Sequence, residues 1–186
     1  MPNRLMTLIA FGLLTTAPAA AQQIESAYSD VDLDQCLVLH ADDFGARWAC
    51  PGYKGYPLMI AEGDLRFFVS YGFGALDEKA ASQTPPPFNY LGPKIEWRLT
   101  NEDGGWKPFA TILRYFTSHE SGDAEAQVLV VTRLEPGATC HVAYVDATAN
   151  ENANEMAREA ADDLARDFDC EDEPEIVGAF EAWDVD

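Results

Sequence analysis

The three histidines are the first residues that could carry acid–base chemistry in this chain. None of them forms a His-x-x-x-His pair or stands in a metal-ligand spacing with a cysteine: they are His40, His119 and His141. His141 follows Cys140 directly, and alternation along a strand turns two such side chains to opposite faces. His141 as a catalytic base and His40 beside two aspartates as a cation ligand stay open as alternatives to ordinary sheet and surface positions.

The other usual catalytic groups lack a recognisable arrangement. No serine stands in a Gly-x-Ser-x-Gly elbow, and no Gly-rich phosphate loop precedes a helix. Paired carboxylates could serve a glycosidase, but 32 Asp and Glu residues make coincidental pairs inevitable. A hydrolase that acts on cell-envelope material through carboxylates without a motif is therefore an alternative function, and no catalytic residue is assigned.

A run of alternating acids suggests calcium but does not fit a calcium loop. Asp30, Asp32 and Asp34 could open an EF-hand, which would then need Gly at its sixth place and Glu at its twelfth. The chain has Gln35 and Ala41 at those places. We therefore interpret the run as the start of a strand and predict no metal ion and no cofactor.

The best candidate for ligand or partner binding is the loop that holds Tyr53, Lys54 and Tyr56. Two tyrosines offer a broad amphipathic contact area, and Gly52 and Gly55 let the backbone approach a ligand. Arg66, one of few positive charges, lies nearby in the sequence. The alternative is that both tyrosines cap the edge of the core.

Four cysteines predict two disulfides. Cys36, Cys50, Cys140 and Cys170 form no Cys-x-x-Cys pair, which disfavours a four-cysteine metal site. Cys36 and Cys50 lie on two strands that pair as neighbours. A strand from Cys140 advances about 20 Å, and the following helix returns about 30 Å, so we predict the pairs Cys36–Cys50 and Cys140–Cys170.

The first residues have the form of a secretory signal peptide. Arg4 precedes a short apolar run, and small residues stand before Gln22. We predict a signal peptide over 1–21, one domain over 22–186 with no membrane span, and a periplasmic or secreted location. Cleavage removes Arg4 and no acid, so the formal charge of -20 becomes -21. Such a chain repels nucleic acid and anionic membranes. Its acidity serves solubility, or alternatively attracts a basic partner or cations.

The clearest structural pattern runs from Gln127 to Cys170. Two runs of alternating apolar residues flank Glu135-Pro136-Gly137, which is typical of a tight turn. Apolar residues then recur at helical spacing, with Leu164 and Phe168 expected against the sheet. A capping box of Thr148 and Glu151 predicts the helix start. The pattern predicts a hairpin covered by one amphipathic helix over about 149–168.

The rest of the chain predicts further hairpins. We expect strands over 31–40, 48–50, 58–61, 65–71, 94–100 and 109–116, and a loose polar segment over 22–30. The irregular segment 77–93 contains Pro85-Pro86-Pro87, followed by Phe88 and Tyr90 as an alternative docking segment. Ile176, Val177, Phe180 and Trp183 have helical spacing and predict a short last helix.

The expected fold is α+β, an antiparallel sheet of successive hairpins with about eight short strands and a C-terminal amphipathic helix. The predicted function is a non-enzymatic periplasmic binding or accessory module. Its partner would be a basic periplasmic protein or a small ligand, because the chain is acidic and lacks a catalytic set.

Overall fold

The alternating apolar residues in the middle of the chain form the larger of two sheets, here called sheet A. The computed structural model describes residues 23–102, 104–118 and 125–184, so the predicted signal peptide and His119 lie outside the described residues. Sheet A has six strands, in the spatial order β1 (Ile24–Asp30), β6 (Asn89–Glu102), β7 (Gly105–Ser118), β8 (Glu125–Arg133), β9 (Cys140–Asp146) and β10 (Glu175–Ile176). All neighbouring strands pair antiparallel except β9 and β10, which run parallel.

The hairpins predicted between residues 31 and 71 form a separate four-stranded sheet, here called sheet B. Its strands follow one another in space as in the sequence: β2 (Leu37–Asp42), β3 (Gly45–Cys50), β4 (Leu58–Gly63) and β5 (Arg66–Tyr71). Short 3-10 helices occupy Leu33–Gln35, Tyr53–Gly55 and Lys79–Ser82. The described residues thus hold ten strands where about eight were expected.

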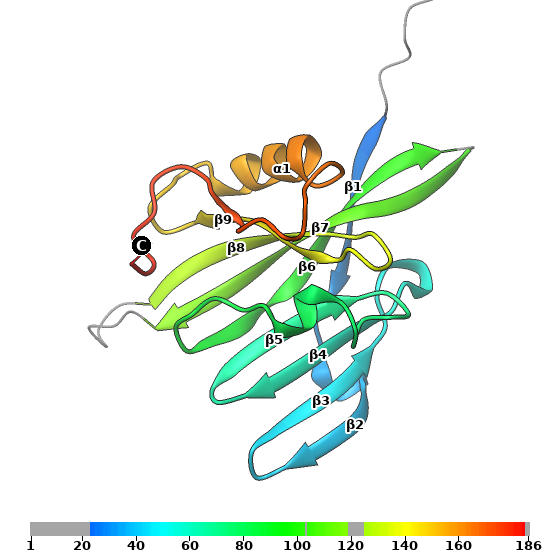
Figure 1. The fold of residues 1–186 in the computed structure, drawn as a ribbon, viewed down its shortest axis with the longest axis vertical. Coiled ribbons are helices and arrows are strands. Elements are labelled where there is room, and N and C mark those ends of the chain that lie inside the picture. The colour runs from blue at the N-terminus through cyan, green and yellow to red at the C-terminus, as the bar shows by residue number, and fades with distance from the viewer. Residues whose placement is uncertain (1–22, 103, 119–124, 185–186) are drawn as a thin grey trace, which may run out of the picture.

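Sheet A is the middle of three layers, with sheet B on one face and the helix α1 (Ala153–Leu164) on the other (Figure 1). Ile60 and Val69 of sheet B meet Trp97 and Val130 of sheet A in one buried core. On the opposite face, apolar residues of β7, β8 and β9 pack against the alanines of α1 in a second core. The expected α+β fold, with a helix covering one sheet face, is confirmed.

The helix is shorter than its apolar spacing predicts. It covers Ala153–Leu164, and Asn152 stands at its N-cap without a side-chain hydrogen bond. The predicted capping box is wrong, because Thr148 Oγ1 accepts a hydrogen bond from the Gln127 N–H instead. Leu164 is only partly buried, as is Phe168, because small alanines let the helix approach the sheet closely and take the buried positions.

The segment predicted to be loose at the start of the domain is a strand. β1 pairs with β6 over its whole length, from Ile24 opposite Thr100 to Asp30 opposite Lys94. Its polar side chains find partners across the pair: Trp97 Nε1 donates to Ser29 Oγ at 2.8 Å. The polar composition therefore reflects an edge position in sheet A and not a lack of structure.

The predicted last helix is also wrong. β10 adds two residues to sheet A, and the chain then follows an irregular path that the Asn150 side chain holds, bonding the N–H and the carbonyl of Ala179. Gly178 has φ of +83°, and a Cβ there would lie 2.2 Å from Met156 Cε, so the close approach to α1 requires glycine. The apolar spacing arises because the Trp183 ring packs on Tyr144 and the Phe180 ring packs on Trp183.

Both predicted disulfides are confirmed. Cys36 is joined to Cys50, and Cys140 is joined to Cys170, so no cysteine among the described residues is free. Within the same part of the chain, no helix has the length and apolar character that a membrane crossing requires.

Candidate functional site

His141 lies inside the protein and does not face a substrate. A bulge in β9 opposite Thr132 turns His141 to the same side as Tyr144, and its Nδ1 lies 2.9 Å from the Tyr144 hydroxyl. The backbone N–H of His141 donates a hydrogen bond to Gln83 Oε1 at 2.8 Å. Burial lowers the pKa of His141 to about 3, because the charged ring would lose its hydration. This neutral, enclosed ring positions Tyr144 and is unsuited to act as a base.

His40 lies on the surface of β2. Its Nε2 is 3.0 Å from Asp42 Oδ2, and both side chains are exposed. Among the residues that the structure describes, no three His, Cys, Asp or Glu side chains gather in a way that could hold a metal ion.

The buried carboxylate of Glu96 in sheet A is engaged in ion pairs. Glu96 accepts hydrogen bonds from Arg158 Nε at 2.7 Å and from the Ser26 hydroxyl at 2.6 Å, while Arg98 binds Asp162 of α1 through Nε at 2.8 Å and Nη2 at 2.5 Å. Burial would raise the pKa of Glu96, but the Arg158 and Ser26 hydrogen bonds outweigh it and hold the pKa below its ordinary value. These groups fasten α1 to sheet A, and the lowered pKa keeps Glu96 ionised near neutral pH, so Glu96 is not a proton donor.

The tyrosines of the predicted binding loop pack on the core. The Tyr53 and Tyr56 rings lie 6.2 Å and 5.9 Å from the Trp97 ring, centroid to centroid. Gly52 makes this approach possible, because a Cβ there would lie 2.9 Å from the Trp97 ring. Lys54 remains exposed, with its Nζ 5.2 Å from the Tyr53 ring centroid. The loop closes the edge of the core and presents mainly Lys54 to solvent.

Arg66 does not join that loop. It stands opposite Gly63 at the turn between β4 and β5, whereas Tyr56 precedes the opposite end of β4. A strand of this length separates its ends by about 17 Å. Arg66 instead binds the Asp64 carboxylate and donates to the carbonyl of Pro86 at 3.4 Å.

The outer strand of sheet B carries three successive exposed apolar residues. Among the strands that the structure describes, none pairs with the outward side of β2, and no residue of β2 is buried. Leu37, Val38 and Leu39 expose 67%, 55% and 48% of their surfaces. Open apolar edges of this kind are normally shielded, because they invite pairing with another chain.

A disulfide fixes this exposed strand in place. Cys36 directly precedes β2 and is bonded to Cys50 at the end of β3, with 4.4 Å between the Cα atoms. At its other end a tight turn joins Asp42 to Gly45, and Asp42 Oδ1 accepts the Phe44 N–H at 2.8 Å. β2 is therefore held at both ends although its side chains contribute nothing to either core.

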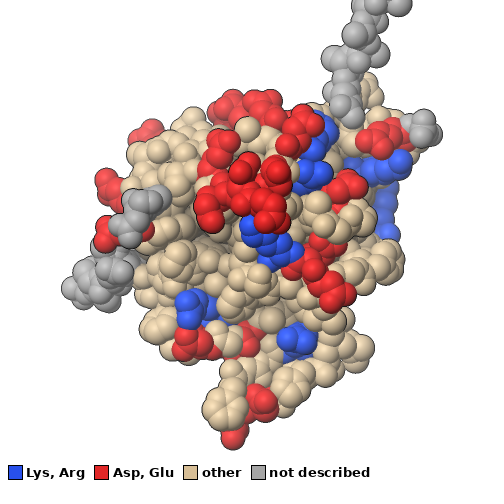
Figure 2. Space-filling model, viewed as in Figure 1, with Lys and Arg blue, Asp and Glu red and all other residues tan. Residues whose placement is uncertain are grey.

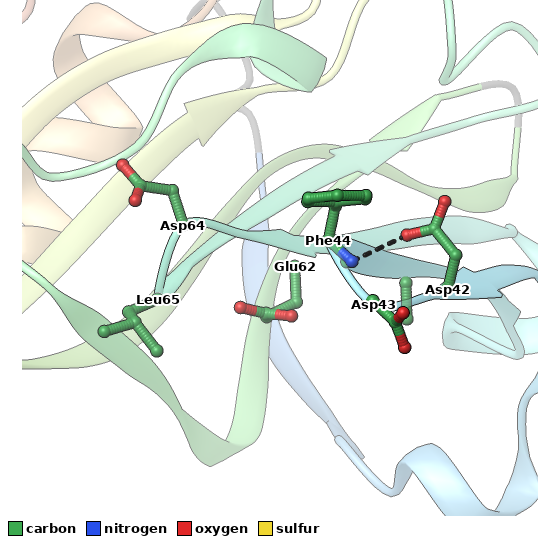
Figure 3. A pocket seen from close by; sticks show the side chains of 8 residues that line it. Asp42, Asp43, Phe44, Glu62, Asp64 and Leu65 are labelled. Atoms are coloured by element: carbon green, nitrogen blue, oxygen red, sulfur yellow. Dashed lines mark hydrogen bonds between the residues drawn. The ribbon is translucent and has the colours of Figure 1, made fainter.

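The tips of the two sheet B hairpins lie beside the end of this strand. They enclose a shallow hollow of about 530 Å³, with Phe44, Asp42 and Asp43 on one side, Asp64 and Leu65 on the other, and Glu62 between them (Figure 3). Phe44 exposes 88% of its surface and Leu65 64%. Figure 2 shows acids gathered over the helix side of the molecule and again at the lower end, where the tip of the β2–β3 hairpin lies.

The turn between β4 and β5 carries unusual backbone angles. Asp64 and Leu65 have φ of 53° and 60°, the left-handed region that favours glycine or asparagine. Leu65 nevertheless keeps an apolar side chain pointing into solvent.

The other edge of sheet B is covered. The Phe67 N–H donates to Asn89 Oδ1 at 2.9 Å, and its carbonyl accepts from Thr84 Oγ1 at 2.7 Å. The Asn89 N–H donates to the Leu65 carbonyl at 3.0 Å, and its side-chain amide donates to Pro85 and Pro87 carbonyls at 3.1 and 2.9 Å. The proline-rich segment thus seals the β5 edge, while Phe88 just beyond it stays exposed.

Sequence reasoning placed a strand at β2 but did not recognise it as a site. The available signal was three successive apolar residues, 37–39, where a half-buried strand would alternate. Acids precede and follow that run, and a cysteine pair encloses it. No family model, curated protein or solved structure matches this chain.

Proposed function

We propose that this chain is an exported binding module that performs no chemistry and holds a basic partner protein at the β2 edge of sheet B. The observation that carries the proposal is that β2 buries none of its residues, yet a disulfide fixes it. A strand without core contacts would otherwise fray, and the link from Cys36 to Cys50, which lies in the core, holds β2 in one conformation. A preorganised strand binds with a smaller loss of conformational entropy.

The charge around the edge supports a basic partner. Asp32 and Asp34 lie before β2, and Asp42, Asp43, Glu62 and Asp64 lie at its far end. Arg47 opposes His40 on β3, and Arg66 is bound to Asp64, so carboxylates dominate the surface. The chain as a whole carries a formal charge of -20, which steers a cationic protein toward it and repels nucleic acid.

The two disulfides support an oxidising compartment, and we place the protein in the periplasm or outside the cell. The loop of Tyr53, Lys54 and Tyr56 remains a proposed second contact, with Lys54 as its accessible group. Arg66 belongs to the hairpin tips and would contact the partner there.

Affinity capture followed by measurement on purified proteins tests this function. The mature chain and a Phe44→Ser, Leu65→Asn variant are used as baits on exported proteins, with Phe73→Ser as a control at another highly exposed aromatic residue. The expected partner is basic, is retained by the control and is lost by the variant. Its dissociation constant should rise with salt as the Debye length falls below about 8 Å. An acidic partner, or binding that neither salt nor the variant changes, would contradict the proposal.

The alternative, hydrolysis of cell-envelope material, is tested on the same preparations. The binding module should leave peptidoglycan and simple esters unchanged over long incubation. Turnover that one Asp or Glu substitution abolishes, in a variant that still folds, would show that the protein is an enzyme.

A further inference from the structure

We propose that the partner supplies an extended segment that pairs with β2 as an additional outer strand of sheet B. This inference rests on the proposed function and specifies how the partner is held. The segment has apolar residues in its middle and Lys or Arg at its ends.

The position of β2 provides the first argument. β2 is bonded to β3 on one side and ends the strand order of sheet B on the other. Every second residue of an edge strand points its N–H and carbonyl outward, and these groups form the main-chain bonds of an added strand. The strand has six residues, so it offers about 20 Å of pairing length.

The contrast with the β5 edge provides the second argument. There, Asn89 and Thr84 bond the outward backbone groups of Leu65 and Phe67. An extended segment of this same chain therefore already occupies one edge of sheet B. The β2 edge is open instead and exposes Leu37 and Val38 for a corresponding segment of another protein.

A second copy of this chain does not fit the edge. Acids precede β2 at Asp32 and Asp34 and stand at its far end at Asp42 and Asp43. Antiparallel pairing of two β2 strands would place the first pair against the second, and parallel pairing would place like against like, so both arrangements bring carboxylates together. A segment with Lys or Arg at both ends would instead place a positive charge beside the acids at each end of β2.

A bulge at Leu39 limits which segments can pair. Val38 is opposite Trp48 and His40 is opposite Arg47, so Leu39 has no opposing residue on β3. Such a bulge increases the local twist and disfavours indiscriminate pairing with flat strands. The added strand must follow this twist, which makes the edge selective.

A synthetic peptide with alternating Val and Thr in its middle and two Lys at each end tests the mode of binding. The mature chain should bind it, and hydrogen exchange at the β2 amides should slow by about tenfold or more when the peptide is bound. N-methylation of alternate amides along one edge of the peptide should weaken binding by about tenfold, whereas methylation along the other edge should change it less than about twofold. Equal effects of the two methylated peptides would overturn strand addition.

Protein variants provide the matched comparison. Val38→Lys and, separately, Leu37→Lys should weaken binding by about tenfold or more, while Phe73→Lys adds the same charge elsewhere and should change it less than about twofold. A peptide with Glu in place of Lys should bind at least about tenfold more weakly, and equal binding would contradict the charge argument. If the chain alone forms a dimer that Val38→Lys dissociates, a second copy occupies the edge and the inference is wrong.

Failure of this inference is distinguishable from failure of the proposed function. A captured basic partner that depends on Phe44 and Leu65 but leaves exchange at the β2 amides unchanged would overturn strand addition alone. Absence of any salt-dependent partner would overturn both.

Discussion

The β5 edge and the β2 edge of sheet B differ in where their outward backbone groups go. At the β5 edge, Thr84 and Asn89 take up those groups and a proline-rich segment closes over them. At the β2 edge, apolar side chains stand in solvent and a disulfide holds the strand. Hydrogen bonds to a covering segment hold one edge and a covalent link fixes the other, so the same sheet has a covered edge and an accessible edge.

The largest expected difference concerns the two disulfides. Replacing Cys140 and Cys170 with Ala should lower the free energy of unfolding by about 3–4 kcal/mol, because the link closes a long loop around a core strand. Replacing Cys36 and Cys50 should cost less and chiefly speed hydrogen exchange in β2, since this hairpin can open locally. Urea unfolding and exchange measurements check both. Equal losses of stability would mean that β2 belongs to the cooperative core.

The covering of the β5 edge should be the next most sensitive feature. Asn89→Ala should destabilise the protein by about 2–4 kcal/mol, because it leaves the Phe67 N–H and the Pro85 and Pro87 carbonyls without their partner. Asn154→Ala removes one exposed hydrogen bond to Arg114 and should change stability by less than about 0.5 kcal/mol. Similar effects in thermal or urea unfolding would show that Asn89 does not close the edge.

The buried side of the molecule should also respond to acid. Folding lowers the pKa of His141 to about 3 from an ordinary value of 6.5, so the unfolded chain binds the extra proton first. Its contribution to stability is therefore lost as pH falls from about 6.5 toward about 3, with a slope near 1.4 kcal/mol per pH unit. His141→Gln should reduce the slope of unfolding free energy against pH by that amount. If His141→Gln leaves this slope unchanged, the acid sensitivity of the protein arises from residues other than His141.

The smallest effect is expected at the open edge. Leu37→Ser together with Val38→Thr should change the free energy of unfolding by less than about 0.5 kcal/mol, as for other exposed positions. Leu58→Ala on β4 removes a buried side chain of the same sheet and should cost about 2–4 kcal/mol. A large loss in the β2 variant would show that the edge is packed and would remove the basis of the comparison.

Local patterns in the sequence predicted the parts of the fold that depend on neighbours. The β8–β9 hairpin, the helix after it and both cysteine pairs follow from alternation, helical spacing and element length. β1 could not be predicted in this way, because its partner β6 lies far along the chain and the pairing leaves no period in Ile24–Asp30. The prediction of a helix after β10 was wrong, because the aromatic residues that pack near Tyr144 happen to have helical spacing in the sequence.

Local sequence patterns also predicted only part of the candidate site. The predicted tyrosine loop was identified from composition, which does not distinguish an exposed ring from one that lies on Trp97. Arg66 was near that loop in sequence and is distant in space, because β4 separates them. The β2 edge depends on which strand ends the sheet, and that follows only from the pairing of all its strands.

The left-handed turn at Asp64 and Leu65 means that one residue can shift stability and recognition in opposite directions. A side chain in this conformation costs about 1–2 kcal/mol relative to glycine. Glycine at position 65 would relax the backbone and, by the same change, erase the apolar group opposite Phe44 across the hollow. Selection for thermal resistance alone would therefore be expected to remove the apolar side chain at the hairpin tip where we propose that the partner binds. Directed evolution toward tighter binding would be expected to retain the strained backbone there.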